Sequence, residues 1–263
     1  MKNRILLIGS IVLMIALVLA FSSCPGPNPD PDPDPVLPIP PPAQPPTTPE
    51  AAGDDGVYTN GTNLVIKNGT QVYDVSDPYY GSIADTPPYS GSGDTVTISK
   101  NHNDVGTVWL PANGKWGTTT IAAPSDDILV SFSDFCDERL DFTPPAGSIK
   151  KGADVHVAYF QLYCRQEDPI YLFHSFHIVA PNTIFQGRYP ESGEIFRYVY
   201  SKGEVIAQLL LTEVEPGWFV EANLHLKAGW NCIAGSVSGN TSTLVSKNPM
   251  PGARWVRLDY STW

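Results

Sequence analysis

The sequence predicts an all-β protein, an antiparallel β-sandwich of immunoglobulin-like or transthyretin-like type, built as one large or two small modules. From Val57 onward, short runs of β-branched and aromatic residues alternate with Gly, Asn, Asp, Pro and Ser. This is the pattern of strands joined by tight turns. No window shows a convincing 3.6-residue period of apolar residues, so no amphipathic helix is expected.

Residues 1–23 have the pattern of a signal peptide. Lys2 and Arg4 precede an uninterrupted run of 17 apolar or small residues, 5–21, and two serines and Cys24 follow. A basic start, an apolar stretch and a small-residue processing site are the parts of a secretory signal. An uncleaved membrane anchor is the alternative, since the run is at the short end of what spans a bilayer.

The residues around Cys24, Phe-Ser-Ser-Cys, resemble the bacterial lipobox. The resemblance implies that Cys24 is lipid-modified, with palmitate-like acyl chains, and becomes the mature N-terminus. Several acyl chains hold a protein on a membrane far more firmly than one. Pro25 stands where lipoproteins retained in the inner membrane often carry Asp, so the resemblance favours the outer membrane or cell surface, with the periplasmic face as the alternative.

Residues 24–49 are predicted to be a tether. Residues 25–49 hold 13 of the 26 prolines and no aromatic residue, so they cannot bury a core. Each proline fixes φ and disfavours helix in the residue before it, which predicts a polyproline II spacer. At about 3.1 Å per residue, such a spacer would hold the folded body roughly 70 to 80 Å from the membrane.

Asn-Gly turns place the strands of the folded body. The strongest hairpin signal is Asn68-Gly69 between the runs 64–67 and 71–75, because Asn-Gly accepts the positive φ values of a type I′ turn. Asn60-Gly61 and Asn113-Gly114 predict two further turns. Further strands are expected at 95–99, 107–110, 118–122, 128–132, 155–164, 170–179, 195–200, 205–214, 218–226, 230–237 and 255–260.

Charge divides the body into unequal halves. Residues 50–150 carry 5 basic and 14 acidic side chains, whereas residues 151–263 carry 9 and 10. A boundary between an acidic β module, 50–150, and a second β module, 151–263, is therefore predicted, although one large sandwich could show the same asymmetry. The body as a whole is acidic, with 14 basic and 24 acidic residues. This excludes nucleic-acid binding through a basic surface.

The C-terminal half carries three short motifs in order: Phe-Arg-Tyr-Val-Tyr-Ser-Lys-Gly at 196–203, Leu-His-Leu-Lys-Ala-Gly-Trp-Asn at 224–231, and Arg-Trp-Val at 254–256. This order resembles small uncharacterised all-β lipoproteins of spirochaetes and similar double-membrane bacteria. The resemblance covers at most residues 110–263. It implies a fold and a location, and no activity. Trp230 is expected to plug the sandwich core.

The residue types that carry chemistry form no recognisable constellation, so no catalytic residue, metal site or cofactor is predicted. His174 and His177 are expected on one strand, where positions three apart face opposite ways and cannot share a metal. Glu213 and Glu215 share a strand face near Trp218, which suits a sugar site, although an exposed acidic strand face is the commoner interpretation. A structural calcium ion in one of the Asp- and Asn-rich loops between Asp54 and Asp141 stays an alternative.

Three cysteines remain after Cys24: Cys136, Cys164 and Cys232. An odd number allows at most one bridge within the chain. Strand parity places Cys164 with Phe160 and Leu162, which suits a buried thiol as well as a bridge.

A long aromatic segment, 76–93, is the one candidate for ligand contact. It holds Tyr79, Tyr80 and Tyr89 among Pro and Gly, and exposed tyrosines on a rigid sandwich suit sugar or protein binding. The alternative is that these rings cap the core. We therefore expect a lipid-anchored protein that binds a glycan or a protein at the surface, or has a structural role in the envelope. The alternative is a carboxylate-dependent glycoside hydrolase.

Overall fold

The computed structural model describes residues 55–75, 80–139, 143–165, 172–186 and 189–261. The chain divides into two units, residues 1–40 and 41–263, and every described residue belongs to the second. The predicted signal peptide (1–23), Cys24, the tether (24–49) and Tyr79 lie outside the described residues.

Strands dominate the described residues, in the order β1 (Val57–Asn60), β2 (Asn63–Ile66), β3 (Val72–Val75), β4 (Tyr80–Ser82), β5 (Asp94–Lys100), β6 (Asn103–Leu110), β7 (Thr119–Ile121), β8 (Val130–Ser131), β9 (Ile149–Lys151), β10 (His156–Arg165), β11 (Leu172–Val179), β12 (Ile184–Gln186), β13 (Tyr189–Ser192), β14 (Ile195–Ser201), β15 (Val205–Glu215), β16 (Trp218–Leu226), β17 (Gly229–Ser238), β18 (Thr241–Ser246) and β19 (Arg254–Ser261). Between them lie the helix α2 (Phe132–Arg139) and short 3-10 turns at Ile83–Asp85 and Asp126–Ile128. The all-β, sandwich-like class predicted from the sequence is confirmed.

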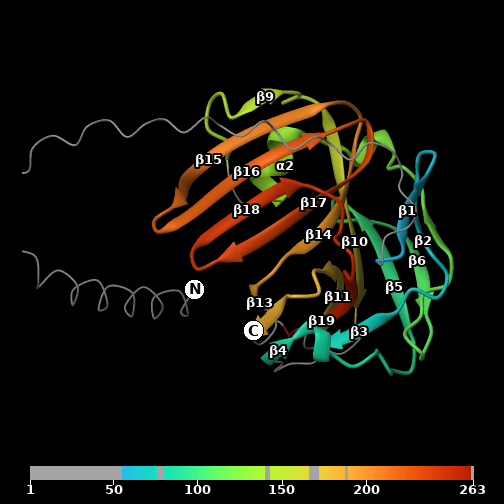
Figure 1. Cartoon of the computed structure of the whole chain (residues 1–263). Helices are drawn as coiled ribbons and strands as arrows, with labels where there is room; N and C mark the ends of the chain where they lie inside the picture. The colour runs from blue at the N-terminus through green and yellow to red at the C-terminus, as the bar shows by residue number, and fades with distance from the viewer. Residues whose placement is uncertain (1–54, 76–79, 140–142, 166–171, 187–188, 262–263) are drawn as a thin grey trace, which may run out of the picture. The chain divides into compact units, whose positions relative to one another are not determined.

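One large curved sheet organises the molecule (Figure 1). Its order is β3-β19-β11-β10-β14-β17-β18-β16-β15-β9, with β5, β6 and β8 attached beside β10. The pairs are antiparallel except β16 with β18 and β19 with β3, which are parallel. Strands from both sides of residue 150 hydrogen-bond in this sheet, for example β5 with β10 and β9 with β15.

One face of the large sheet is closed by the small sheet β1-β2-β7 and the segment that carries Trp116. The small sheet contributes Leu64, Ile66 and Ile121, all buried. They pack against the side chains that β10, β11, β14 and β19 point toward them, such as Phe160, Phe176, Phe196 and Trp255. We call this surface of the large sheet the closed face.

The opposite face is covered in two places. Beneath α2, the side chains of Phe132 and Phe135 pack with Val199, Val205 and other residues of the curled sheet. At the other end, Phe185 of β12 and Ile83 pack against Val179, Val256 and Leu258. These two small cores leave a stretch of the sheet between them.

Two local expectations are wrong. Asn68-Gly69 turns the chain, with Gly69 at φ 84°, but the flanking strands do not form a hairpin, because β2 pairs with β1 and β7 while β3 pairs with β19. Of the expected strand 128–132, only Val130–Ser131 (β8) is strand, because Ile128 ends a 3-10 turn and Phe132 begins α2. The turns at Asn60-Gly61 and Asn113-Gly114 are confirmed, with Gly61 at φ 61° and Gly114 at φ 66°.

Candidate binding pocket

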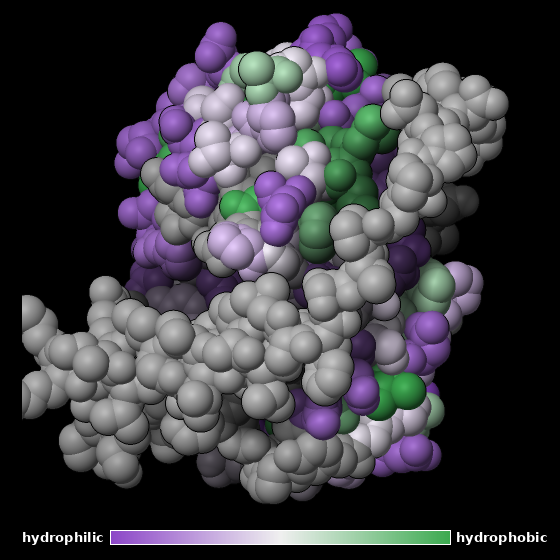
Figure 2. Space-filling model, turned by 90° about the vertical axis from the view of Figure 1, so that its left-hand side faces the viewer, coloured by the Kyte–Doolittle hydropathy of each residue, from purple (hydrophilic) through white to green (hydrophobic). Residues whose placement is uncertain are grey.

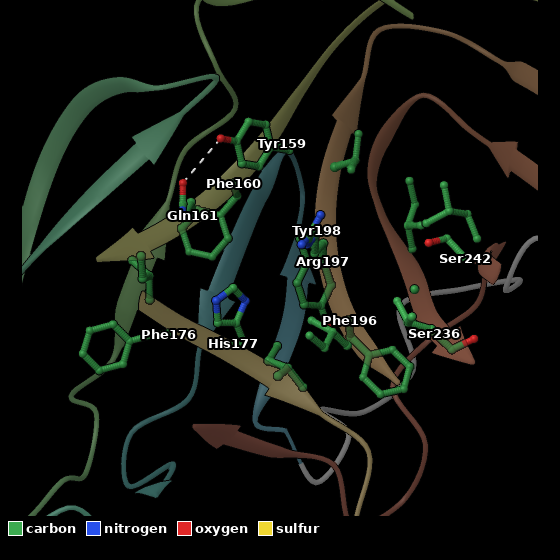
Figure 3. Close-up of a pocket in the computed structure, with 18 of the residues that line it drawn as sticks. Tyr159, Phe160, Gln161, Phe176, His177, Phe196, Arg197, Tyr198, Ser236 and Ser242 are labelled. Carbon is green, nitrogen blue, oxygen red and sulfur yellow. Dashed lines mark hydrogen bonds between the residues drawn. The ribbon is translucent and has the colours of Figure 1, made fainter. Parts of the chain in front are cut away.

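A pocket of about 400 Å³ opens on the sheet between the two small cores (Figure 3). This volume is within the range of sites for small molecules. Its polar lining includes His102, Tyr159, Gln161, His177, Arg197, Tyr198, Ser236 and Ser242. No Asp or Glu is among the residues described as lining it.

The pocket exists because three strands separate at one point. β10 pairs with β14 through Val157–Tyr159 and with β11 through Leu162–Arg165, so the two partners share one edge of β10. β11 and β14 also pair with each other, beyond that point. Gln161, His177 and Arg197 lie where the three strands part, and residues from both faces line the opening. Figure 3 shows these three side chains projecting from their three strands.

The side chains along β14 show why this place is left uncovered. Ile195, Arg197 and Val199 alternate onto the same face. Ile195 packs with the core under β12 and Val199 with the core under α2. Arg197 falls between the two cores and is exposed. We call Gln161, His177, Arg197 and Gly235 the polar band.

Arg197 is the only described arginine side chain without a protein partner. Arg257 pairs with Asp74 at 3.1 Å and with Asp94 at 3.6 Å, and Arg254 donates to the carbonyl oxygen of Ile83 at 3.3 Å. Arg197 makes no ion pair or hydrogen bond with any residue that the structure describes. Its guanidinium therefore keeps its donors for water or a ligand.

His177 is a half-buried ring on the pocket wall, and its Nε2 lies 2.7 Å from the Ser175 hydroxyl oxygen. Burial, together with the nearby Arg197 charge, lowers the pKa of His177 to about 3. The ring is therefore neutral at pH 7. One of its nitrogens is engaged by Ser175, and the pocket holds one positive charge on this wall rather than two.

Tyr159 is placed by an unusual turn. Asn101 has φ 47°, and its buried side chain accepts a hydrogen bond from the backbone N–H of Tyr159 at 3.1 Å. His102, with φ 62°, packs edge-on against the Tyr159 ring, with centroids 5.7 Å apart. The Tyr159 hydroxyl lies 3.2 Å from the His102 Nε2 and donates to the Oε1 of Gln161 at 3.4 Å (Figure 3). The Gln161 amide NH2 then stays available as a donor.

Two glycines keep the pocket open. A Cβ on Gly235 would meet the Leu244 side chain at 3.4 Å and otherwise open space, so a larger residue there would extend into the pocket. Gly193 has φ 97°, and a Cβ there would lie 2.5 Å from the Thr183 Cα. Only glycine permits this close approach, which brings Glu194 and Ile195 to the pocket edge.

Beyond the pocket floor lies a buried polar cluster on the closed face. The Tyr198 hydroxyl donates to the Asp55 carboxylate at 2.9 Å, and the Trp255 indole donates to the Asp55 carbonyl at 2.8 Å. Burial, with Cys232 and Asp55 nearby, raises the pKa of Tyr198 well above its usual value. These groups satisfy one another and pin the start of the folded body.

Of the three predicted site tyrosines, the structure describes only the side chain of Tyr89, which is not among the residues that line this pocket. Tyr89 is buried at 3% exposure, its hydroxyl donates to Asp94 at 2.9 Å, and the Arg257 guanidinium lies 5.4 Å from its ring centre. Burial and Asp94 raise its pKa to about 12. Tyr80 begins β4, and its side chain, like all of Tyr79, lies outside the described residues. Tyr89 itself caps the core, and a ligand role for the three tyrosines stays a prediction.

The other residues considered as sugar-binding or metal-binding candidates make contacts that support the fold. Glu213 is exposed and accepts a hydrogen bond from the Gly217 backbone N–H at 2.7 Å, which closes the β15–β16 turn. The side chain of Glu215 lies outside the described residues. His174 and His177 lie on the strand β11, as expected, and no cluster of metal-ligating side chains occurs among the described residues. Trp230 packs beside the core and donates to the Thr62 carbonyl at 3.0 Å.

Cys136, Cys164 and Cys232 are free and buried. Cys164 packs with Phe160 and Leu162, as strand parity predicted. Burial raises the pKa of Cys136 and of Cys164 to about 12, so both stay protonated thiols at neutral pH.

Comparison with known protein families, curated proteins and solved structures finds no match. Among the described residues, no helix is long and apolar enough to span a membrane. The resemblance of residues 110–263 to spirochaete lipoproteins stays a prediction.

Sequence reasoning missed the polar band. Its signal was present in Ile195–Val199, where Arg197 interrupts an apolar stripe of alternate residues, and in 173–179, where Ser175 and His177 together stand between Phe173 and Val179. A polar residue on an otherwise apolar strand face marks either a buried polar contact or an uncovered site. A buried polar contact can be told from an uncovered site only when the parts of the sheet that α2 and β12 cover are known.

Proposed function

We propose that the chain is a lipid-anchored binding protein of the bacterial outer membrane or cell surface, whose folded body captures a glycan in the pocket of the polar band. The observation that carries this is a pocket of about 400 Å³ that presents Tyr159, Gln161 and Arg197 as hydrogen-bonding groups beside apolar walls. Sugar rings offer the same mixture of apolar faces and hydroxyl groups. A mainly apolar pocket with a few hydrogen-bonding side chains suits them.

The lining gives no support to hydrolysis at this place. A glycoside hydrolase of the common type needs two carboxyl groups about 5 to 10 Å apart on either side of the bond that breaks. The described lining contains neither Asp nor Glu. Binding without cleavage is therefore the activity that the pocket favours.

A pocket-filling variant tests the proposal. The purified full-length protein, in detergent, is screened on a glycan array and then compared with Gly235→Leu. The new side chain would occupy the pocket, so binding should fall at least tenfold while the melting temperature stays close to that of the parent. Gly239→Leu is unsuitable as a control because Gly239 has φ 59°. Gly106→Leu, where a Cβ meets nothing within 4 Å, is the matched control and should bind normally.

The tyrosine segment provides the competing outcome. If Gly235→Leu binds as well as the parent but Tyr79→Ser with Tyr80→Ser does not, the contact lies at segment 76–93 and the pocket is not the site. Tyr89→Ser is kept out of this variant, because loss of a buried ring would lower stability and confuse the comparison.

The anchor is tested separately. Cells fed a palmitate analogue should label the protein, and Cys24→Ala should abolish the label and release the protein from the membrane fraction. Label that survives Cys24→Ala would contradict lipidation at this residue. The membrane fraction that holds the labelled protein then distinguishes the outer membrane from the inner one.

A further inference from the structure

We infer that the glycan bound at the polar band is acidic, and that its anionic group lies against Arg197; this rests on the proposed function. The first step is the state of Arg197 itself. It is the one described arginine without a partner, and it lines a pocket in which no described residue is acidic. A guanidinium so placed has no carboxylate of the protein to compete with a ligand.

The second step is what happens when a ligand covers this side chain. A neutral ligand would displace water from the guanidinium and return only part of the lost hydrogen bonding, which is costly. An anionic oxygen pair restores it, because a carboxylate matches the planar fork of arginine with two parallel hydrogen bonds. A ligand that covers Arg197 is therefore expected to carry an anionic group.

The third step concerns the groups around Arg197. His177 is neutral, with Nε2 beside Ser175, so it adds no second charge that would call for a phosphate-like dianion. The Gln161 amide and the Tyr159 hydroxyl lie on the neighbouring strand as partners for sugar hydroxyls. One cation flanked by neutral hydrogen-bonding groups matches a saccharide with a single negative charge per ring.

The net negative charge of the chain does not prevent an acidic glycan from binding at the pocket. The formal net charge is −11, but charges more than about 8 Å away are largely screened at physiological salt. Glu194, which lies between the lining residues Gly193 and Ile195 in the sequence, is held by Lys247 at 2.6 Å. The local field at the pocket is therefore set by Arg197.

The test compares matched sugars on the full-length protein in detergent by calorimetric titration. Oligosaccharides of galacturonic, glucuronic and sialic acid are measured against their methyl esters, and sulfated galactose oligomers against unsulfated ones. At least one acidic sugar should bind tenfold or more tightly than its neutral match. The carboxylate and sulfate series identify which anion is taken.

Variants tie the preference to Arg197. Arg197→Gln should remove the preference, so that the acidic sugar and its neutral match bind with equal affinity within about twofold. Arg197→Lys should retain part of it, since charge remains but the planar fork is lost. Lys67→Gln, an equal change of charge at an exposed residue of the turn after β2, should change nothing.

Three results would overturn the inference, and they are distinguishable. Equal binding of acidic and neutral sugars, abolished in both cases by Gly235→Leu, would leave the pocket as a glycan site and remove the acidic ligand. Absence of binding to every sugar, charged or neutral, would remove the glycan function together with the inference. An acidic preference that persists in Arg197→Gln would place the anion elsewhere.

Discussion

The two faces of the large sheet use the same strands for opposite purposes. On the closed face, β10, β11 and β14 point aromatic residues into a filled core beneath β1-β2-β7. On the other face, the same strands present Gln161, His177 and Arg197 between two small cores. Since alternate residues of one strand serve both faces, a change at one position tests one face with little disturbance of the other.

The difference lies in how polar groups are satisfied. The closed face buries Asp55, but Tyr198 and Trp255 both donate to it. The other face leaves Arg197 without a protein partner. Because the Arg197 guanidinium is exposed, water supplies its hydrogen bonds, and a ligand that covers it has to replace them.

The largest expected effect is on the closed face. Trp116 is fully buried and packs edge-on against Phe176 and Trp255, with ring centres 5.5 and 6.0 Å away. Trp116→Ala should lower the free energy of unfolding by about 3 to 5 kcal/mol, measured by urea denaturation. Trp116→Phe should cost less, because the buried indole N–H, which has no hydrogen-bond partner, is removed with the lost volume. Equal losses in the two variants would contradict this account.

A smaller loss is expected where an arginine is paired. The Arg257 side chain is 13% exposed, lies between Asp74 and Asp94, and faces the Tyr89 ring. Arg257→Gln should lower the free energy of unfolding by about 2 kcal/mol, between the values typical of exposed and of buried pairs, since two carboxylates lose their cation. The loss should shrink when Asp94→Asn is added. No loss at all would show that these ion pairs are as weak as those of an open surface.

Acid should destabilise the protein through His177. Its folded pKa of about 3 is below the unfolded value of about 6.5. The unfolded chain therefore binds a proton that the folded one does not, and stability is complete above pH 6.5 and is lost as the pH falls toward 3. At pH 5 the loss is about 2 kcal/mol from this group.

The acid effect is measured by urea denaturation at pH 7.5 and pH 5. His177→Gln should reduce the difference between the two pH values by most of that amount. His156→Gln, at an exposed histidine, is the control and should leave the difference unchanged. If both variants behave alike, the acid sensitivity has another source.

Much of the fold could be predicted because its signals are local. Period-2 alternation identified β10, β11, β14 and β16. The partner of a strand is not local, which is why Asn68-Gly69 predicted a hairpin that does not form. The helix α2 did have a local signal: the Ser131 hydroxyl accepts from the Asp134 backbone N–H at 3.1 Å and donates to its carboxylate at 2.7 Å, so a serine caps the helix N-terminus.

The candidate site was not predictable for the same reason. The polar band consists of single residues from four strands, 74 positions apart at the extremes, Gln161 and Gly235. Each by itself is an ordinary polar or small residue on a strand. Only the parting of β10, β11 and β14 brings them together, and that depends on long-range register. Tyr89, by contrast, looked exposed in sequence because Arg257, its partner, lies 168 residues away.

The smallest expected change in stability, that of Arg197→Gln, is the most informative about the difference between the two faces of the sheet. Arg197→Gln should change the free energy of unfolding at pH 7.5 by no more than about 0.5 kcal/mol, because no described contact is lost. It should also raise the pKa of His177, since the Arg197 charge is the second cause of its low value after burial. Titration of the His177 ring protons by NMR measures this shift, which should be upward and leave the pKa below its usual range. A stability loss as large as that of Arg257→Gln would mean that Arg197 supports the fold, and the contrast between a satisfied face and an open one would fail.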